Sequence, residues 1–228
     1  MGPTLLLFDI DGTILLTKGV GTRALAAAAE RLFGKPFDIT AINTAGNLDP
    51  LIYLELAAQH AIDAPLQHHE AFRDLYLKEL AVGLKGANSV YALPGIHGLL
   101  NELKNHRGAL LGLLSGNYRA AIPIKFGPIG INPDWFTITA LGDEAPTRPD
   151  LVALAMDRYK KHLGVAPAPN RVVVIGDTPR DVSCAHAHNC VAFGVATGRF
   201  SSDDLEKAGA EFVVEDLSDP TPLLKLLV

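Results

Sequence analysis

The sequence predicts an α/β protein with a doubly wound, mainly parallel sheet and an inserted α-helical subdomain. Three observations support this prediction: short apolar segments alternate with helical periodicity, the strongest apolar segments end in polar residues, and one long interval contains only helix-like patterns. Parallel strands need crossover connections, usually helices, and the ligands of such sheets bind beyond the carboxyl ends of the strands. We therefore look for a functional site among the polar residues at these ends.

Six short apolar segments have the composition of strands. The first is a run of leucines and phenylalanine that ends in Asp9, and a valine-rich segment likewise ends next to Asp177. Short length and near-continuous apolar character are typical of strands that are buried on both faces of a parallel sheet. We expect strands at 4–9, 109–114, 135–140, 171–176, 190–195 and 211–214, of which 135–140 has the weakest signal.

Helical patterns separate these segments. Apolar residues recur at helical spacing in 95–106, directly after Pro94. A second helix is expected over 150–163, where Asp150 provides the negative charge that is favoured in a first helical turn.

A long interval without strong strand signals follows the first strand. It contains helix-like stretches at 22–33, 50–60 and 67–82. An ordinary crossover needs only about a dozen residues, so this block is too long to be a simple connection. We predict a core formed by 1–16 and 91–228, with a helical subdomain formed by 17–90.

Composition and charge exclude several classes of protein. The chain has 228 residues, 48% of them hydrophobic, which is enough to bury a substantial core. A formal net charge of -5, without a run of Lys and Arg, argues against nucleic acid or an anionic membrane as a partner. No apolar run approaches the ~20 residues of a membrane span, and the two cysteines form neither a disulfide framework nor a CxxC motif. No basic segment precedes a long apolar one, so we expect no secretory signal. We expect a cytoplasmic, soluble protein with a small-molecule partner, and its oligomeric state stays open.

Polar residues of several distant segments are expected to meet at one edge of the sheet. A single carboxylate in a loop is more often a turn former than a catalyst, so the prediction depends on the whole set. Because the carboxyl ends of parallel strands share one edge, these side chains can converge there. The set is Asp9, Asp11, Ser115, Arg148, Asp177 and Asp181.

Four short motifs carry a resemblance to a known family. They are DIDGT at 9–13 after an apolar strand, SGN at 115–117, Arg148 before a proline, and GDTPRD at 176–181. Together and in this order they resemble the motifs of the haloacid dehalogenase-like hydrolase superfamily, in particular its phosphoglycolate phosphatase-like branch. The resemblance implies a Rossmann-like core, a helical cap formed by the inserted block, and a phosphatase that acts on a small phosphorylated metabolite.

The resemblance also implies a covalent mechanism that depends on Mg²⁺. Asp9 would attack the phosphate ester and form an aspartyl-phosphate. Because two anions must approach each other, a hard cation with oxygen ligands is needed, and Asp9, the backbone carbonyl of Asp11 and the carboxylate of Asp177 would hold it. Asp181 would bind a metal-bound water or fix the basic residue; a carboxylate that only stabilises a helix start is the alternative.

Further motif residues have expected roles in proton transfer and substrate binding. Asp11 would protonate the leaving oxygen and then deprotonate the attacking water. Thr13, whose hydroxyl would brace the loop, is expected beside the substrate. Ser115 and the backbone N–H groups of Gly116 and Asn117 would donate to the phosphoryl oxygens.

The motifs identify the basic residue and the leaving-group contacts less clearly than they identify the carboxylates. Lys is commoner in the family where this chain has Arg148, but Arg does the same electrostatic work through bidentate hydrogen bonds. Lys125, in a segment with helical character, is the nearest alternative. Asn47 and Asp49, which lie in a Gly-containing interruption between two predicted helices, are expected to contact the leaving group.

Other functions fit parts of the sequence. The dehalogenases of the superfamily generally lack an acid at position 11, so Asp11 weighs against that chemistry. A phosphomutase, which passes the phosphoryl group to a second hydroxyl, stays open as an alternative. A non-catalytic regulatory module is less favoured because Asp9 and Asp177 are also present. The GxGxxA pattern at 19–24 begins about ten residues beyond the nearest strand, so we do not interpret it as a dinucleotide site.

Overall fold

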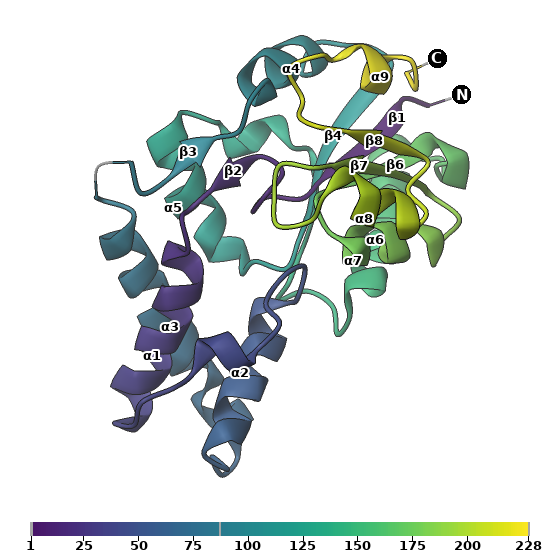
Figure 1. Cartoon of the computed structure of the whole chain (residues 1–228). Coiled ribbons are helices and arrows are strands. Elements are labelled where there is room, and N and C mark those ends of the chain that lie inside the picture. The colour runs from purple at the N-terminus through teal and green to yellow at the C-terminus, as the bar shows by residue number, and fades with distance from the viewer. Residues whose placement is uncertain (1, 87, 228) are drawn as a thin grey trace.

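The core is a six-stranded parallel sheet, shown in Figure 1 by a computed structural model that describes residues 2–86 and 88–227. Its strands are β1 (Thr4–Phe8), β4 (Ala109–Ser115), β5 (Ile138–Leu141), β6 (Val172–Gly176), β7 (Val191–Val195) and β8 (Phe212–Val214). Their order is β5-β4-β1-β6-β7-β8, and every neighbouring pair is parallel. The predicted fold class is confirmed.

Each predicted strand segment overlaps one of these strands. The weakest, 135–140, starts too early, because β5 begins only at Ile138. Trp135 lies instead in a short 3-10 turn over Pro133–Trp135, whose first residue is a proline. A proline has its φ fixed and lacks the N–H that a strand ladder needs, so it favours this turn over a longer strand.

Helices cover both faces of the sheet. They are α4 (Ile96–Leu103), α5 (Ile122–Phe126), α6 (Arg148–Leu163), α7 (Pro179–His186), α8 (Ser202–Lys207) and α9 (Thr221–Leu224). One face packs against α4, α5 and α9, and the other packs against α6 and α7. Further 3-10 turns lie at Ile39–Ala41, Arg119–Ala121, Gly127–Ile129 and Pro169–Arg171. Among the described residues, no helix has both the length and the apolar character needed to cross a membrane.

Strand β1 is buried on both faces. Leu6 and Phe8 belong to the apolar cluster under α4, whereas Leu5 and Leu7 belong to the cluster under α6 and α7. Successive side chains of a strand point to opposite faces, so a strand that is covered on both sides needs apolar residues throughout. This explains why the segment has a continuous apolar sequence that ends abruptly at Asp9.

The inserted helices form a layer of their own beyond one end of the sheet. Helices α1 (Val20–Phe33), α2 (Asp49–Gln59) and α3 (Pro65–Gly83) pack on one another around a separate apolar cluster. In Figure 1 they lie at the far end of the molecule from both chain termini. Tyr118 and Ala121 of the core belong to the same cluster, so the helical block packs directly against the segment that follows β4.

A short antiparallel ribbon connects the helical block to the core. It consists of β2 (Leu15–Leu16) and β3 (Tyr91–Ala92), which precede and follow the three helices. Neither strand was predicted from the sequence, because two residues are too few to show a period of two.

Candidate active site

The three central strands bring the predicted motifs together. Phe8 at the end of β1 is in register with Leu113 of β4 on one side and Ile175 of β6 on the other. Asp9 therefore follows the central strand between the two flanking strand ends. The chain adds β4 and β5 on one side of β1 and then β6 on the other side, so the strand order reverses at β1, which is where open α/β sheets form a ligand crevice.

Asp9 is buried and held by the main chain and one cation. Its N–H donates to the Ile175 carbonyl over 2.8 Å, and its Oδ1 lies 3.1 Å from Nη2 of Arg148. Burial raises the pKa of the Asp9 carboxyl to about 6, because it disfavours the charge more than Arg148 favours it; the neighbouring Asp181 and Asp11 also raise it. Asp9 is thus a carboxylate whose charge is poorly solvated, favoured by Arg148 and opposed by the neighbouring carboxylates.

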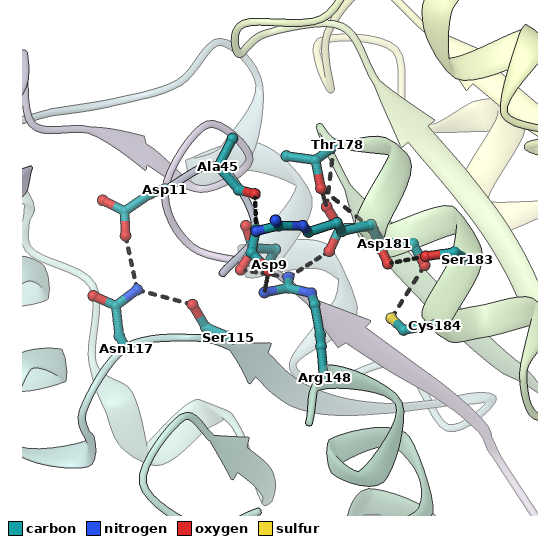
Figure 2. Close-up of polar contacts among 12 residues, drawn as sticks. Asp9, Asp11, Ala45, Ser115, Asn117, Arg148, Thr178, Asp181, Ser183 and Cys184 are labelled. Carbon is teal, nitrogen blue, oxygen red and sulfur yellow. Dashed lines mark hydrogen bonds and ion pairs between the residues drawn. The ribbon is translucent and has the colours of Figure 1, made fainter. Parts of the chain in front are cut away.

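Arg148 is a buried cation between two carboxylates. It is the first residue of α6, whose preceding Thr147 accepts the N–H of Asp150 as an N-cap. Its Nη2 contacts both Asp9 and Asp181, as Figure 2 shows. Burial disfavours its charge, but the two carboxylates outweigh burial and hold the pKa of the guanidinium well above its usual value. Arg148 is therefore a fixed positive charge.

Asp181 combines the two structural roles that its position allowed. One oxygen, Oδ2, accepts from the N–H and the hydroxyl of Thr178 over 3.0 and 2.6 Å and closes a capping box at the start of α7. The other oxygen binds Arg148. The same side chain thus stabilises a helix start and fixes the basic residue, which the sequence had presented as alternatives.

Asp177 supplies an unpaired acceptor to a cluster of carboxylates. Ligand oxygens of Asp9, Asp177 and Asp181 all lie within 4.8 Å of one another. Oδ1 of Asp177 is buried and makes no hydrogen bond to any described residue. Burial, Asp9 and Asp181 raise the pKa of the Asp177 carboxyl to about 8. A hard divalent cation fits this group of crowded carboxylate oxygens, because its charge would offset their mutual repulsion and it would bind the oxygen that has no hydrogen bond.

Glycines give this cluster its room. Gly12 has φ +93, and a Cβ at either Gly12 or Gly198 would collide with the Asp177 carboxylate. The left-handed conformation and the close approach both exclude a side chain at Gly12, which accounts for the glycine of the first motif. Thr13 does not brace this loop as expected, because its hydroxyl is buried and makes no hydrogen bond to any described residue. The brace comes from Thr197, whose hydroxyl donates to the Gly12 carbonyl over 2.6 Å.

A second polar group surrounds Asp11. Nδ2 of Asn117 donates to Asp11 Oδ2 over 2.8 Å and lies 2.9 Å from the Ser115 hydroxyl (Figure 2). Nζ of Lys125, delivered by α5, lies 2.5 Å from the same Asp11 oxygen and also donates to Oδ1 of Asn117. The lysine side chain is 3% exposed, so it is part of the site. Lys125 and Arg148 were alternatives in the sequence, whereas the structure brings both to the site, where Lys125 contacts Asp11 and Arg148 contacts Asp9 and Asp181.

Asp49 joins the helical block to the loop after β4. Its N–H donates to the Gly116 carbonyl over 2.8 Å, and its Oδ2 accepts the N–H of Tyr118 over 3.0 Å. Burial raises the pKa of the Asp49 carboxyl to about 7, against the opposing effects of Lys125 and of the Tyr118 N–H. Asn47 lies nearby, but its side-chain atoms bind the Glu55 carboxylate and the Leu48 N–H at the start of α2.

Two arginines hold the segment 43–49 against the strand ends. Arg180 donates to the carbonyls of Ala45 and Asn43 over 2.9 and 3.4 Å, and Arg148 donates to the carbonyl of Gly46 over 3.3 Å. Arg180 lies within the GDTPRD motif, but the sequence assigned it no role, because its partners are main-chain carbonyls. These contacts place the helical block directly over the carboxylate cluster.

The resulting cavity lies between the sheet edge and the helical block and has a volume of about 410 Å³. The core lines it with the motif residues, and the helical block closes it with a mixture of apolar and polar side chains. The core side chains are Asp9, Asp11, Ser115, Asn117, Lys125, Arg148 and Asp177, and those of the helical block include Thr17, Leu25, Asn47, Asp49, Ile52 and Tyr76.

Comparison with known proteins identifies the family. Residues 3–189 match the model of the haloacid dehalogenase-like hydrolases, which is most of the chain. The protein therefore belongs to the haloacid dehalogenase-like hydrolase family. The resemblance seen in the four motifs is confirmed, and so is the expectation that the protein is a hydrolase.

Individual relatives are similar over nearly their whole length. A phosphoglycolate phosphatase of Vibrio vulnificus is 27% identical over 225 residues, which cover 94% of this chain and 92% of that protein. One from Chromobacterium violaceum is 24% identical over 220 residues and covers 96% and 95%. Among solved structures, a hydrolase from Pseudomonas syringae has a TM-score of 0.72 at 22% identity and covers 97% of this chain and 98% of that one. A putative beta-phosphoglucomutase from Bacteroides vulgatus has a TM-score of 0.71 at 18% identity and covers 99% and 89%.

Proposed function

We propose that the protein is a magnesium-dependent phosphatase that hydrolyses a small phosphorylated metabolite through an aspartyl-phosphate on Asp9. The observation that carries this proposal is the position of Asp9 on the cavity floor, beside a fixed cation and within a carboxylate cluster. The names of the Vibrio and Chromobacterium relatives support a phosphate ester as the substrate. The inserted block, residues 17–90, serves as the cap that closes the cavity.

In the first step, an oxygen of Asp9 attacks the phosphorus atom and the bond from phosphorus to the ester oxygen breaks. Asp11 gives its proton to the departing oxygen, so the leaving group departs as a neutral alcohol. Ser115 and the N–H groups of Gly116 and Asn117 donate to the phosphoryl oxygens, whose charge is spread in the transition state. Lys125 faces the carboxylate that forms on Asp11.

In the second step, water attacks the aspartyl-phosphate. The Asp11 carboxylate takes a proton from that water, the bond between Asp9 and phosphorus breaks, and inorganic phosphate leaves. Asp9 returns to a free carboxylate beside Arg148. The limited volume of the cavity favours small esters.

Mg²⁺ fits the same residues. Asp9, the carbonyl of Asp11 and the carboxylate of Asp177 would hold it. Asp181 would bind a metal-bound water or hold Arg148 in place beside the metal. When bound, it supplies positive charge that offsets the repulsion between the Asp9 carboxylate and the phosphate. The unpaired Oδ1 of Asp177 is the strongest support for this assignment.

Removal of divalent metal is expected to abolish release of phosphate from a generic aryl phosphate. Added Mg²⁺ should restore it, and the Mg²⁺ concentration needed should fall as the pH rises from about 6 to about 8.5. The reason is that metal binding requires ionised carboxylates, and burial raises the pKa of Asp9 and Asp177 to about 6 and about 8. The measurement is steady-state turnover after chelation and during Mg²⁺ titration at each pH. Undiminished turnover after exhaustive chelation would contradict the metal requirement.

A further inference from the structure

We infer that the leaving group of the substrate carries a hydrogen-bond donor, a hydroxyl or an ammonium, and no second anionic group. The inference rests on the proposed phosphatase function and concerns the cap-side end of the cavity, beyond Asp11. There Asp49, Tyr76 and Lys125 line the wall. Their charges and existing contacts decide which leaving groups the wall accepts.

Asp49 offers an acceptor and no positive charge. It is the first residue of α2, lines the cavity and is 7% exposed. Oδ2 accepts the N–H of Tyr118, and within the described parts of the chain no cation lies within 4.0 Å of this carboxylate. Neither of its protonation states supplies a positive charge, so an anion beside it would depend on Lys125 for a counter-ion. Burying a second anion against such a carboxyl is unfavourable.

The buried cations of the cavity already have partners. Lys125 contacts Asp11 and Asn117, and Arg148 contacts Asp9 and Asp181. A carboxylate on the leaving group would share Lys125 with Asp11, the residue that protonates the ester oxygen, and would weaken that contact. A hydroxyl or ammonium leaves these pairs intact.

The other cations that line the cavity belong to its exposed rim. Lys18 lies over the ring of Tyr91, with Nζ 5.3 Å from its centroid, and Arg199 lies over the ring of Phe200 at 5.8 Å. Both are exposed, whereas Asp49 and Lys125 are buried. Rim cations attract a phosphate ester to the opening, but they do not supply a charge at the buried wall.

The remaining walls suit a short, neutral carbon skeleton. Leu25 and Ile52 are apolar and buried, and the buried Tyr76 lines the same cavity as Asp49. A leaving-group donor next to Asp49 would complete the acceptor capacity of that carboxyl, and a site built around such a donor rejects substrates that lack it. Monoesters of small amino alcohols or polyols meet these conditions, and phosphoglycolate, with its carboxylate, does not.

The test compares kcat/KM for ethanolamine phosphate, glycerol phosphate and phosphoglycolate, with an aryl phosphate as a reference ester. We expect the better of the two donor-bearing esters to exceed phosphoglycolate by at least about tenfold, since like-charge juxtaposition costs that much or more. The ratio between the first two esters tells an ammonium from a hydroxyl. The wild-type ratios decide the inference without any variant.

Asp49→Asn provides the residue-level test. The amide keeps an acceptor for the Tyr118 N–H and removes the charge, so the preference over phosphoglycolate should shrink by about tenfold. Asp63→Asn, an exposed acid elsewhere on the cap, should keep the wild-type ratio. Because the readout is a ratio of two substrates on one enzyme, it does not depend on the amount of folded protein.

Three outcomes overturn the inference. If kcat/KM for phosphoglycolate equalled or exceeded that for both donor-bearing esters, and the aryl phosphate were also turned over, the inference would be wrong and the phosphatase proposal would stand. A ratio that Asp49→Asn leaves unchanged would overturn the role of Asp49. Release of phosphate from none of the esters, the aryl phosphate included, would overturn the phosphatase proposal and this inference with it.

Discussion

Asp9→Asn is expected to lower kcat/KM for an aryl phosphate by at least about a thousandfold, as loss of a covalent nucleophile does in other enzymes. The amide keeps the shape of the side chain and its position after β1, but its oxygen is too weak a nucleophile to attack phosphorus. Asparagine also removes a buried charge whose pKa is raised to about 6 by desolvation, so the fold should tolerate the change. The measurement is Mg²⁺-dependent phosphate release under steady-state conditions.

Asp157→Asn is the matched control for this substitution. Asp157 lies on α6 and pairs with Lys161 at the surface, where its side chain is 49% exposed, so the variant should turn over like the wild type. Mg²⁺-dependent release by Asp9→Asn at a rate close to that of the control would contradict a covalent role for Asp9.

Arg148→Met is expected to reduce both stability and activity. Removal of one partner from a buried ion pair leaves the other charge uncompensated and costs about 3–5 kcal/mol of unfolding free energy. Here two buried carboxylates, Asp9 and Asp181, lose the same cation. The loss should be larger near about pH 8 than near about pH 5, because burial raises the pKa of Asp9 and protonation of this abandoned carboxylate removes its share of the penalty. Denaturant unfolding of the metal-free protein at both pH values measures it.

Two further variants separate this effect from a general loss of contacts. Lys161→Met breaks an exposed pair, whose side chains are 75% and 49% exposed, and should cost no more than about 0.5 kcal/mol. Arg148→Met combined with Asp181→Asn should recover part of the stability, because one abandoned charge is gone. Turnover should stay low in both Arg148 variants. If Arg148→Met had the same free energy of unfolding as Lys161→Met, the claim that Arg148 stabilises the buried carboxylates would be contradicted.

The core of the fold was predictable because its strands carry local signals. β1, β4 and β6 are short, continuously apolar and buried on both faces, and each ends in polar residues. Strands β2 and β3 were missed because a two-residue pairing depends on the helical block that joins them and has no pattern of its own. The cap boundaries at 17–90 stay a proposal, although the ribbon of β2 and β3 brackets the same interval.

The site was predictable where a residue follows a strand and unpredictable where it depends on tertiary packing. Asp9, Ser115 and Asp177 meet because β4, β1 and β6 are neighbours in the sheet. The distant motifs therefore implied the convergence before any contact was known. The roles assigned to these residues stay proposals.

Three other residues had no comparable signal. Lys125 reaches Asp11 from a short helix whose orientation is set by the packing of Ile122 and Phe126. Arg180 and Thr197 bind main-chain carbonyls, and carbonyls leave no trace in a sequence. Only the folded arrangement could reveal these three contacts.

Trapping of the phosphoenzyme tests the central claim most directly. The protein is mixed with Mg²⁺ and an aryl phosphate, quenched in acid during turnover, digested, and mapped by mass spectrometry. The proposed mechanism predicts a phosphoryl group on the peptide that contains Asp9, sensitive to hydroxylamine as an acyl phosphate should be and absent from Asp9→Asn. A phosphoryl group on any other residue of the wild-type protein would contradict the mechanism.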